Sequence, residues 1–239
     1  ASLGASVAII LGLCIIPGIY GESAVVVNAF AFALVPVLLI ISMSRFKKNI
    51  TPAGMILIGI AVMYIFSATT TLLKITASEE SLAEVYIWSV GTLGKAGWDN
   101  VWYMIAAAVA GIVVFQSLAR RLNVLVMCDS GAVALGVDPK RVRLASLGVV
   151  SLVTAVLVSF TGTIGFVGLV APHMVRMFIG SDNRYLIPAS AAFGALMLLA
   201  SDCVARNIAA VELPVGTITA LIGGPLFLYL IIRQTKSAW

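Results

Sequence analysis

The sequence predicts an all-α protein: a polytopic membrane helical bundle with about eight spanning helices. Hydrophobic residues make up 61% of the chain and charged residues only 10%, whereas a soluble domain carries about 25% charged residues. The mean hydropathy of +1.11 agrees with this bias. The apolar residues also fall into separate runs, most of which reach the roughly 17–25 residues that a helix needs to cross the hydrocarbon core. A bilayer is therefore the predicted solvent of this chain.

The apolar runs are expected to be helices, because a helix satisfies its own backbone hydrogen bonds in lipid. The expected spans are 3–19, 24–43, 53–73, 101–118, 144–164, 165–178, 185–205 and 214–232. The run 165–178 is short, since at ~1.5 Å per residue it reaches only ~21 Å. We therefore expect neighbouring helices to shield its ends.

The distribution of Lys and Arg predicts the orientation of the spans. If they alternate with Ala1 inside, twelve of the 15 Lys and Arg residues fall in inner loops. This is the bias that cytoplasmic loops carry, and it requires the short run 165–178 to cross. The net charge of +5 is then loop charge, so we expect no nucleic-acid partner.

The outer loop 74–100 is long enough to contain structure of its own. We expect a short interfacial helix near 79–91, begun by a capping box of Thr76 and Glu79. Three aromatic residues suit a membrane interface, where the polar edge of the ring stays wet: Tyr86, Trp88 and Trp98. The loop is either an anchored surface segment or a docking surface for an external partner.

The inner loop 119–143 has the pattern of two short helices broken at Gly136. Asp138 and Pro139 suit the start of the second helix, because Pro is tolerated at the first helical position. Spacing alone leaves two interpretations open, a solvated linker and a docking element for a cytoplasmic partner.

The cysteine and histidine content argues against a disulfide framework and a zinc site. Cys14, Cys128 and Cys203 have no paired spacing, and His173 is the single histidine. We therefore expect no metal site on this chain.

Two stretches identify the sequence as resembling the FecCD family, the permeases of ABC importers for ferric siderophores, haem and cobalamin. They are GFVGLVAPHMVR at 165–176 and ELPVGTITALIGGPLFLYL at 212–230. Shorter matches in the same order are WSVGTL at 88–93, LNVL at 122–125, ALGV at 134–137 and DCVAR at 202–206. The resemblance extends over essentially the whole chain.

The resemblance implies a single transmembrane permease domain over 1–239 in the cell membrane (plasma or inner), with multiple passes. The family subunit has ten helices, and the helices here resemble the third to the tenth. Because the chain begins at Ala1 inside an apolar stretch, we expect that it is truncated and lacks the first two helices. The implied partners are a second copy of the subunit, a cytoplasmic P-loop ATPase dimer and an extracytoplasmic substrate-binding protein.

The resemblance also implies that the loop 119–143 docks on the ATPase. The expected coupling residues are Asp129, Ala132, Leu135, Gly136, Val137 and Asp138. The family usually has two acidic residues near Cys128 to Ser130 and an arginine near Val133. Since this stretch is less charged, the resemblance implies docking but no particular salt bridge.

The implied translocation pathway runs along 53–73 and 214–232 at the dimer axis. Its expected pathway and gate residues are Thr51, Pro52, Gly216, Thr219, Gly223, Gly224 and Pro225. Small residues permit close helix approach, and a proline allows a bend. Ordinary helix packing explains each glycine as well, and hydroxyls such as that of Thr219 can bond to their own helix. Both interpretations stay open.

Two further positions are expected to lie near the membrane surfaces. By resemblance, Arg206 and Glu212 dock the external binding protein, since an arginine suits pairing with a carboxylate. The alternative is that Arg206 pairs with Asp202, four residues earlier on the same helix.

Pro172 and His173 lie on the short run 165–178. We interpret both as structural, although a proton relay through the histidine is conceivable.

The predicted function is that of a permease that moves a metal chelate inward, with an iron–siderophore as the first candidate and haem, cobalamin or molybdate as others. We expect no catalytic residue and no cofactor on this chain, because ATP and Mg would bind to the partner ATPase. An ion-coupled secondary transporter is the alternative, but that class places ionisable groups at mid-membrane. An intramembrane enzyme would need converging nucleophiles, acids or metal ligands.

The purified chain is expected to hydrolyse no ATP, because the sequence has no G-x-x-x-x-G-K-S/T run to cradle phosphates. A phosphate-release assay with Mg-ATP measures this, with a purified P-loop ATPase as the positive control. Hydrolysis that persists after co-purified ATPases are removed would contradict the expected division of labour.

Overall fold

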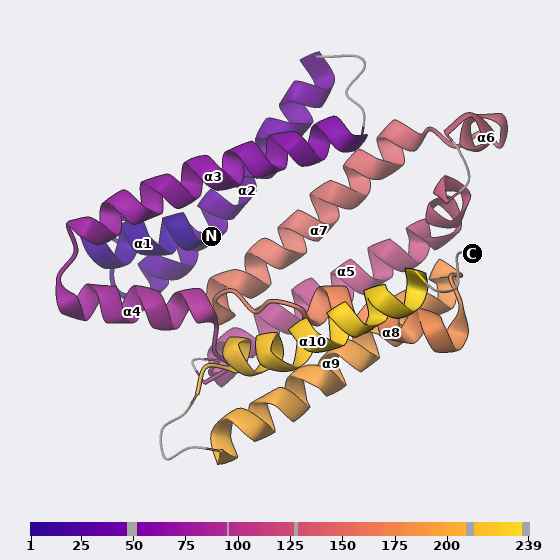
Figure 1. The fold of residues 1–239 in the computed structure, drawn as a ribbon. Helices are drawn as coiled ribbons and strands as arrows, with labels where there is room; N and C mark the ends of the chain where they lie inside the picture. The colour runs from indigo at the N-terminus through magenta and orange to yellow at the C-terminus, as the bar shows by residue number, and fades with distance from the viewer. Residues whose placement is uncertain (47–51, 95, 127–128, 209–212, 236–239) are drawn as a thin grey trace. The chain divides into compact units, whose positions relative to one another are not determined.

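The computed structural model describes residues 1–46, 52–94, 96–126, 129–208 and 213–235. Within these ranges the regular structure consists of ten α-helices and no strand, which confirms the all-α prediction (Figure 1). In chain order they are α1 (Ser2–Leu11), α2 (Glu22–Phe46), α3 (Pro52–Ile75), α4 (Glu79–Val90), α5 (Trp98–Leu125), α6 (Asp129–Ala134), α7 (Pro139–Thr161), α8 (Val167–Ile179), α9 (Asn183–Asn207) and α10 (Val215–Thr235).

Five of these helices are long and apolar enough to cross a membrane, namely α2, α3, α5, α7 and α9. Three shorter apolar helices, α1, α8 and α10, correspond to the remaining predicted spans. The short run predicted at 165–178 is the 13-residue helix α8. Each predicted apolar run therefore contains a helix, and the chain is a membrane protein.

The first predicted span is wrong in its length. We expected a helix over 3–19, but α1 ends at Leu11. Gly12 adopts a left-handed conformation with φ 63° and donates its N–H to the Ala8 carbonyl, which closes the helix. Apolarity continues beyond this point, so hydropathy alone gave no sign of the helix end.

A buried asparagine on α2 stabilises the chain where it leaves α1. Asn28 is 0% exposed. Its Nδ2 donates to the Leu13 carbonyl at 2.7 Å, and its Oδ1 accepts from the Ile15 N–H at 2.9 Å. Backbone groups without a partner are costly in an apolar environment. One side chain therefore satisfies two of the groups that the end of α1 leaves free.

The chain forms two compact units, and the first consists of Ala1–Ser89, Ala96–Ala107 and Leu147–Gly162. In this unit α1 packs against α2 and α3, which also contact each other (Figure 1). Gly4 permits the approach of α1 and α2, because a Cβ at this position would overlap the Asn28 carbonyl. The buried cluster of the unit consists of Ala5, Ala29 and Trp88.

The second unit consists of Val90–Lys95, Ala108–Ser146 and Thr163–Trp239. Here α9 packs against both α8 and α10, and α8 also contacts α10. Gly194 on α9 faces Val167 and Ala171 of α8, where an added Cβ would make ordinary contacts at 3.5 and 3.7 Å. The buried cluster consists of Ala205, Val215 and Ile218.

The helix predicted near 79–91 is confirmed as α4, but its predicted cap is wrong. The Thr76 hydroxyl donates to the Leu73 carbonyl at the end of α3. Ser78 takes the capping position instead, and its Oγ accepts from the Ser81 N–H at 3.3 Å. The sequence pattern failed because α3 continues to Ile75, which makes Thr76 part of the end of that helix.

Only two of the three predicted interfacial aromatic residues are exposed. Tyr86 and Trp98 are exposed, whereas Trp88 is buried against α1 and α2. The Tyr86 ring lies under Lys74, with Nζ 4.6 Å from the ring centroid, a cation–π contact. The prediction for Trp88 was wrong because a buried tryptophan and an interfacial tryptophan look alike in sequence.

Replacement of Asn28 by alanine is expected to lower the free energy of unfolding by about 2–4 kcal/mol, since two partly buried backbone groups lose their partners. Thermal unfolding of the full-length protein in detergent measures this loss. Ser42→Ala, at the other end of α2, is the matched control. The exposed hydroxyl of Ser42 bonds only to the Leu39 carbonyl of its own helix, so the change should stay within about 0.5 kcal/mol. Equal losses in the two variants would contradict this account of the end of α1.

Candidate functional site

The predicted inner loop is shorter and more ordered than expected. Because α5 continues to Leu125 and α7 begins at Pro139, residues 119–125 and 139–143 are helical. Only one separate short helix, α6, lies between them in the described residues. The expected second short helix is in fact the first turn of α7. We call residues 129–138 the coupling segment, because they include all of the predicted coupling residues.

The chain reverses direction after α6 through a Schellman motif. Gly136 has φ 76° and donates its N–H to the Val133 carbonyl. The next residue, Val137, donates to the carbonyl of Ala132, whose side chain is fully buried. A left-handed residue at this place is characteristic of the motif and favours glycine. The break predicted at Gly136 is therefore confirmed, with its cause.

Asp138 caps the N-terminus of α7, as predicted. Its Oδ1 accepts from the N–H groups of Lys140 and Arg141 at 3.0 and 3.2 Å. Its Oδ2 lies 3.1 Å from the Arg141 Nε. Pro139 occupies the first helical position, where its missing N–H has no cost. These contacts fix the direction in which α7 leaves the coupling segment.

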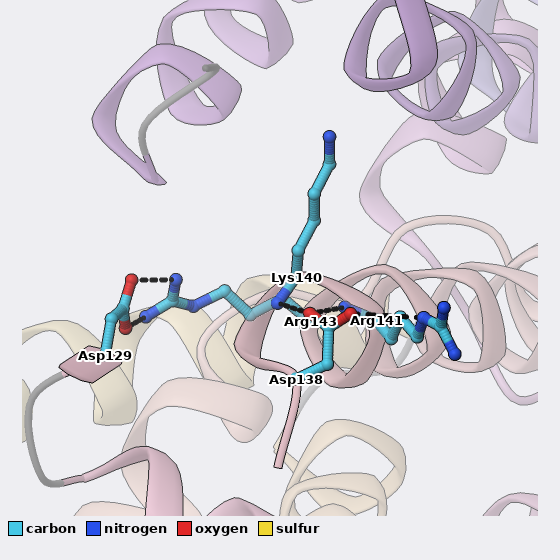
Figure 2. Close-up of polar contacts among 5 residues, drawn as sticks. All are labelled: Asp129, Asp138, Lys140, Arg141 and Arg143. Atoms are coloured by element: carbon cyan, nitrogen blue, oxygen red, sulfur yellow. Dashed lines mark hydrogen bonds and ion pairs between the residues drawn. The ribbon is translucent and has the colours of Figure 1, made fainter. Parts of the chain in front are cut away.

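A bidentate ion pair ties α6 to α7. Figure 2 shows the Asp129 carboxylate facing the Arg143 guanidinium, with N–O distances of 3.0 and 2.7 Å. The hydrogen bonds from Arg143 hold the pKa of Asp129 below its ordinary value of 3.8. Since a lowered pKa keeps the carboxylate ionised, the pair persists at neutral pH and is lost only as the pH falls through that lowered value. Opposite charges 14 residues apart give no recognisable sequence pattern.

The coupling segment presents two apolar side chains to solvent. Val133 and Leu135, here called the exposed apolar pair, are each 62% exposed. Figure 2 also shows that the Lys140 side chain points away from the two aspartates. Of the predicted coupling residues, Ala132, Gly136, Val137 and Asp138 shape the turn and the cap. Leu135 is the predicted coupling residue that has an exposed apolar side chain.

Three backbone segments of the second unit meet at one place, which we call the backbone crossing (Val90, Gly91, Thr163 and Gly216). The Gly216 N–H donates to the Gly91 carbonyl at 3.2 Å. A Cβ on Gly216 would overlap the Val90 carbonyl, and one on Gly91 would lie 2.7 Å from the Thr163 carbonyl. Two glycines thus permit an approach that larger residues would prevent.

Thr219 lies one turn after Gly216 and is fully buried. Its Oγ1 donates to the Gly216 carbonyl at 3.0 Å. The sequence left open whether this hydroxyl lines the pathway or bonds to its own helix. In the structure it bonds to its own helix.

The glycines further along α10 face an aromatic residue that the sequence analysis missed. A Cβ on Gly223 would lie 2.6 Å from the Phe166 Cβ, and one on Gly224 would lie 3.9 Å from the Phe166 Cζ. Phe166 has a φ of 66°. In the described residues it is the one non-glycine residue with a positive φ. Such backbone is costly for a bulky residue. Pro225 follows these glycines within α10.

Pro172 and His173 lie inside α8. The His173 Nδ1 lies 2.8 Å from the Leu169 carbonyl, within hydrogen-bond distance. Its ring meets the edge of Phe227 of α10, with centroids 5.6 Å apart and planes at 88°. Both contacts agree with the structural interpretation of this histidine.

The alternative partner of Arg206 is present in the structure. Its Nε lies 2.8 Å from the Asp202 Oδ2 on the same helix, and its side chain is still 47% exposed. Glu212 and Thr51 lie outside the described residues, and Pro52 is the first residue of α3. The predicted roles of these residues in docking and gating stay predictions.

Comparison with known proteins identifies the family. The FecCD transport family matches residues 1–233. A cobalamin import permease, BtuC of Halobacterium salinarum, is 40% identical over 231 residues, which cover 97% of this chain and 60% of that protein. A hemin transport permease, HmuU of Yersinia pestis, is 36% identical over 211 residues, which cover 88% of this chain and 63% of that protein. The chain thus spans about three fifths of the length of these relatives.

A solved structure has the same fold as this chain. It is described as an inward-facing conformation of a metal-chelate type ABC transporter. The two chains share 30% sequence identity with a TM-score of 0.89, over 97% of this chain and 72% of that one. The sequence, the helical fold and these comparisons agree: the chain belongs to the FecCD transport family.

Proposed function

We propose that this chain belongs to the permease subunit of an ATP-driven importer that moves a metal chelate into the cell. Relatives that are named as permeases for cobalamin import, hemin transport and iron(3+)-hydroxamate import support the chemical class of the cargo. The first candidate is an iron–siderophore, followed by haem and cobalamin, with molybdate as a further candidate. The subunit would work in the plasma or inner membrane as one of two identical copies.

The main observation behind the proposal is the construction of the coupling segment. A ten-residue stretch outside the long helices is fixed by a Schellman motif, a helix cap and a bidentate ion pair. It nevertheless leaves the exposed apolar pair in solvent. Pre-ordered apolar side chains suit a partner, because little conformational freedom remains to be lost on binding. We assign this surface to a cytoplasmic P-loop ATPase, which binds ATP and Mg.

The permease itself would catalyse no reaction. In this proposal ATP-driven closure of the ATPase pair moves the coupling segments, and the two permease copies rock in response. The pathway is assigned to α3 and α10, the helices that contain the two spans implied by the family resemblance. The exposed part of Arg206 supports docking of an external binding protein.

ATP-dependent import tests the proposal directly. The full-length permease, its cognate ATPase and its binding protein are reconstituted in liposomes with ferric hydroxamate, haemin or cobalamin outside. Accumulation that requires both ATP and the binding protein is expected for at least one of these chelates. Accumulation driven by an ion gradient without ATP would refute the importer and favour a secondary transporter.

Substitution of Leu135 by aspartate should reduce co-purification of the ATPase by about tenfold or more, because a buried interface residue would become charged. The fold should be unaffected, since the side chain is exposed, and an unchanged unfolding temperature would check this. Ile87→Asp on α4 is the matched control. That residue is also exposed, at 49%, but lies in the predicted outer loop. If Leu135→Asp retains the ATPase as well as the wild type, the exposed apolar pair is not the docking surface.

A further inference from the structure

A cluster of polar side chains connects the end of α5 to the start of α9, and we call it the polar bridge (Asn123, Asp182 and Asn183). The Asn123 Nδ2 donates to the Asp182 Oδ1 at 2.7 Å. The Asn123 Oδ1 accepts from the backbone N–H and the Nδ2 of Asn183, at 2.9 and 2.8 Å. All three residues are partly buried. The asparagine therefore uses both ends of its amide group on α9.

The bridge is built on the N-cap of α9. Asp182 has an extended backbone, with φ −70° and ψ 113°, and its Oδ1 also accepts from the Arg184 N–H at 3.0 Å. Hydrogen bonds from the Arg184 backbone and then from Asn123 lower the pKa of the Asp182 carboxyl. A negative charge at this position is favoured by the helix dipole.

A second side chain of α5 reaches the same turn of α9. The Gln116 Nε2 donates to the Arg184 carbonyl at 2.9 Å. Since Gln116 lies two helical turns before Asn123, the two side chains project from the same face of α5. In the described part of the chain α9 packs along α8 and α10, and polar side chains attach its first turn to α5. The attachment is directional, because each hydrogen bond has a preferred geometry.

We propose that Asn123 is a positioning residue that transmits movement of the coupling segment to α9. The proposal rests on the proposed function, because it assumes that an ATPase moves the coupling segment. Asn123 lies two residues before the end of α5 at Leu125, and the coupling segment begins at Asp129. In this proposal a displacement of the coupling segment is carried along the chain to Asn123, and the polar bridge passes it to the first turn of α9.

The far end of α9 explains why this link matters for transport. The helix has 25 residues, which at ~1.5 Å per residue span ~37 Å and reach across a bilayer. Its last turns contain the Asp202–Arg206 ion pair. In this proposal α9, which contains Pro188 just after its first turn, carries a movement at the ATPase side toward the opposite side of the membrane.

The test compares Asn123→Asp with the wild type in the complete reconstituted complex. The substitution keeps the size of the side chain but replaces the donor to Asp182 by a second carboxylate oxygen. The readout is the number of chelate molecules imported for each ATP hydrolysed, using whichever of ferric hydroxamate, haemin or cobalamin the wild type imports. We expect this ratio to fall about fivefold or more, while ATP hydrolysis continues.

The double variant Asn123→Asp with Asp182→Asn tests whether the hydrogen bond between positions 123 and 182 carries the effect on the import ratio. It removes one of the two facing carboxylates and provides a new amide donor at position 182, so the import ratio should recover at least in part. Asn100→Asp is the matched control, because it makes the same chemical change at the opposite end of α5. Its ratio should equal that of the wild type.

Each outcome supports or overturns the proposed role of Asn123. An assembled Asn123→Asp complex with the wild-type import ratio would overturn the inference and leave the importer proposal intact. If that variant fails to assemble, the neutral and shorter Asn123→Ser replaces it, and an unchanged ratio there is equally fatal. If the wild-type complex imports none of the three chelates with ATP, the importer proposal fails and the role of Asn123 falls with it.

Discussion

The need to pair every backbone N–H and C=O group governs this chain, because an unpaired group costs several kcal/mol in hydrocarbon. Long helices pair these groups within themselves. The groups at the helix ends need other partners. Gly12 and Asn28 satisfy the chain at the end of α1. Outside the candidate spans, the Schellman motif at Gly136 pairs backbone groups after α6, and Asp182 accepts from the Arg184 N–H at the start of α9.

Close helix contact in this chain relies on missing side chains. Lipid tails are as apolar as leucine, so packing and not the hydrophobic effect holds helices together in a bilayer. Gly4 lets α1 reach the backbone of α2, and Gly216 lets α10 reach the Val90 carbonyl. Gly223 leaves room for Phe166 despite the strained backbone of that residue. Glycine therefore marks the contacts that set the position of a helix.

The sequence was informative wherever a local pattern had one physical solution. Hydropathy located a helix in each of the predicted runs, and Asp138 with Pro139 marked the start of α7. The pairing of Arg206 with Asp202 follows from their i, i+4 spacing. The coupling residues and the gate were proposed by resemblance, and their roles remain to be tested.

The features that escaped prediction depend on partners far away in sequence. The end of α1 requires Asn28, and the burial of Trp88 requires α1 and α2. Asp129 and Arg143 are 14 residues apart, and Asn123 and Asp182 are 59 apart. The local sequence around one residue of such a pair does not indicate which residue is its partner. A pattern of apolar and polar residues encodes the helices but not these long-range contacts.

The backbone crossing has a consequence for biogenesis. Translation proceeds from the N-terminus, and the segment with Val90 and Gly91 emerges long before Gly216. The hydrogen bond between Gly216 and Gly91 therefore forms only after α10 has entered the membrane. Until then the earlier helices of the second unit are present in the bilayer without the contact that closes it. The nascent chain therefore needs the arrival of α10 to complete the packing of its second unit.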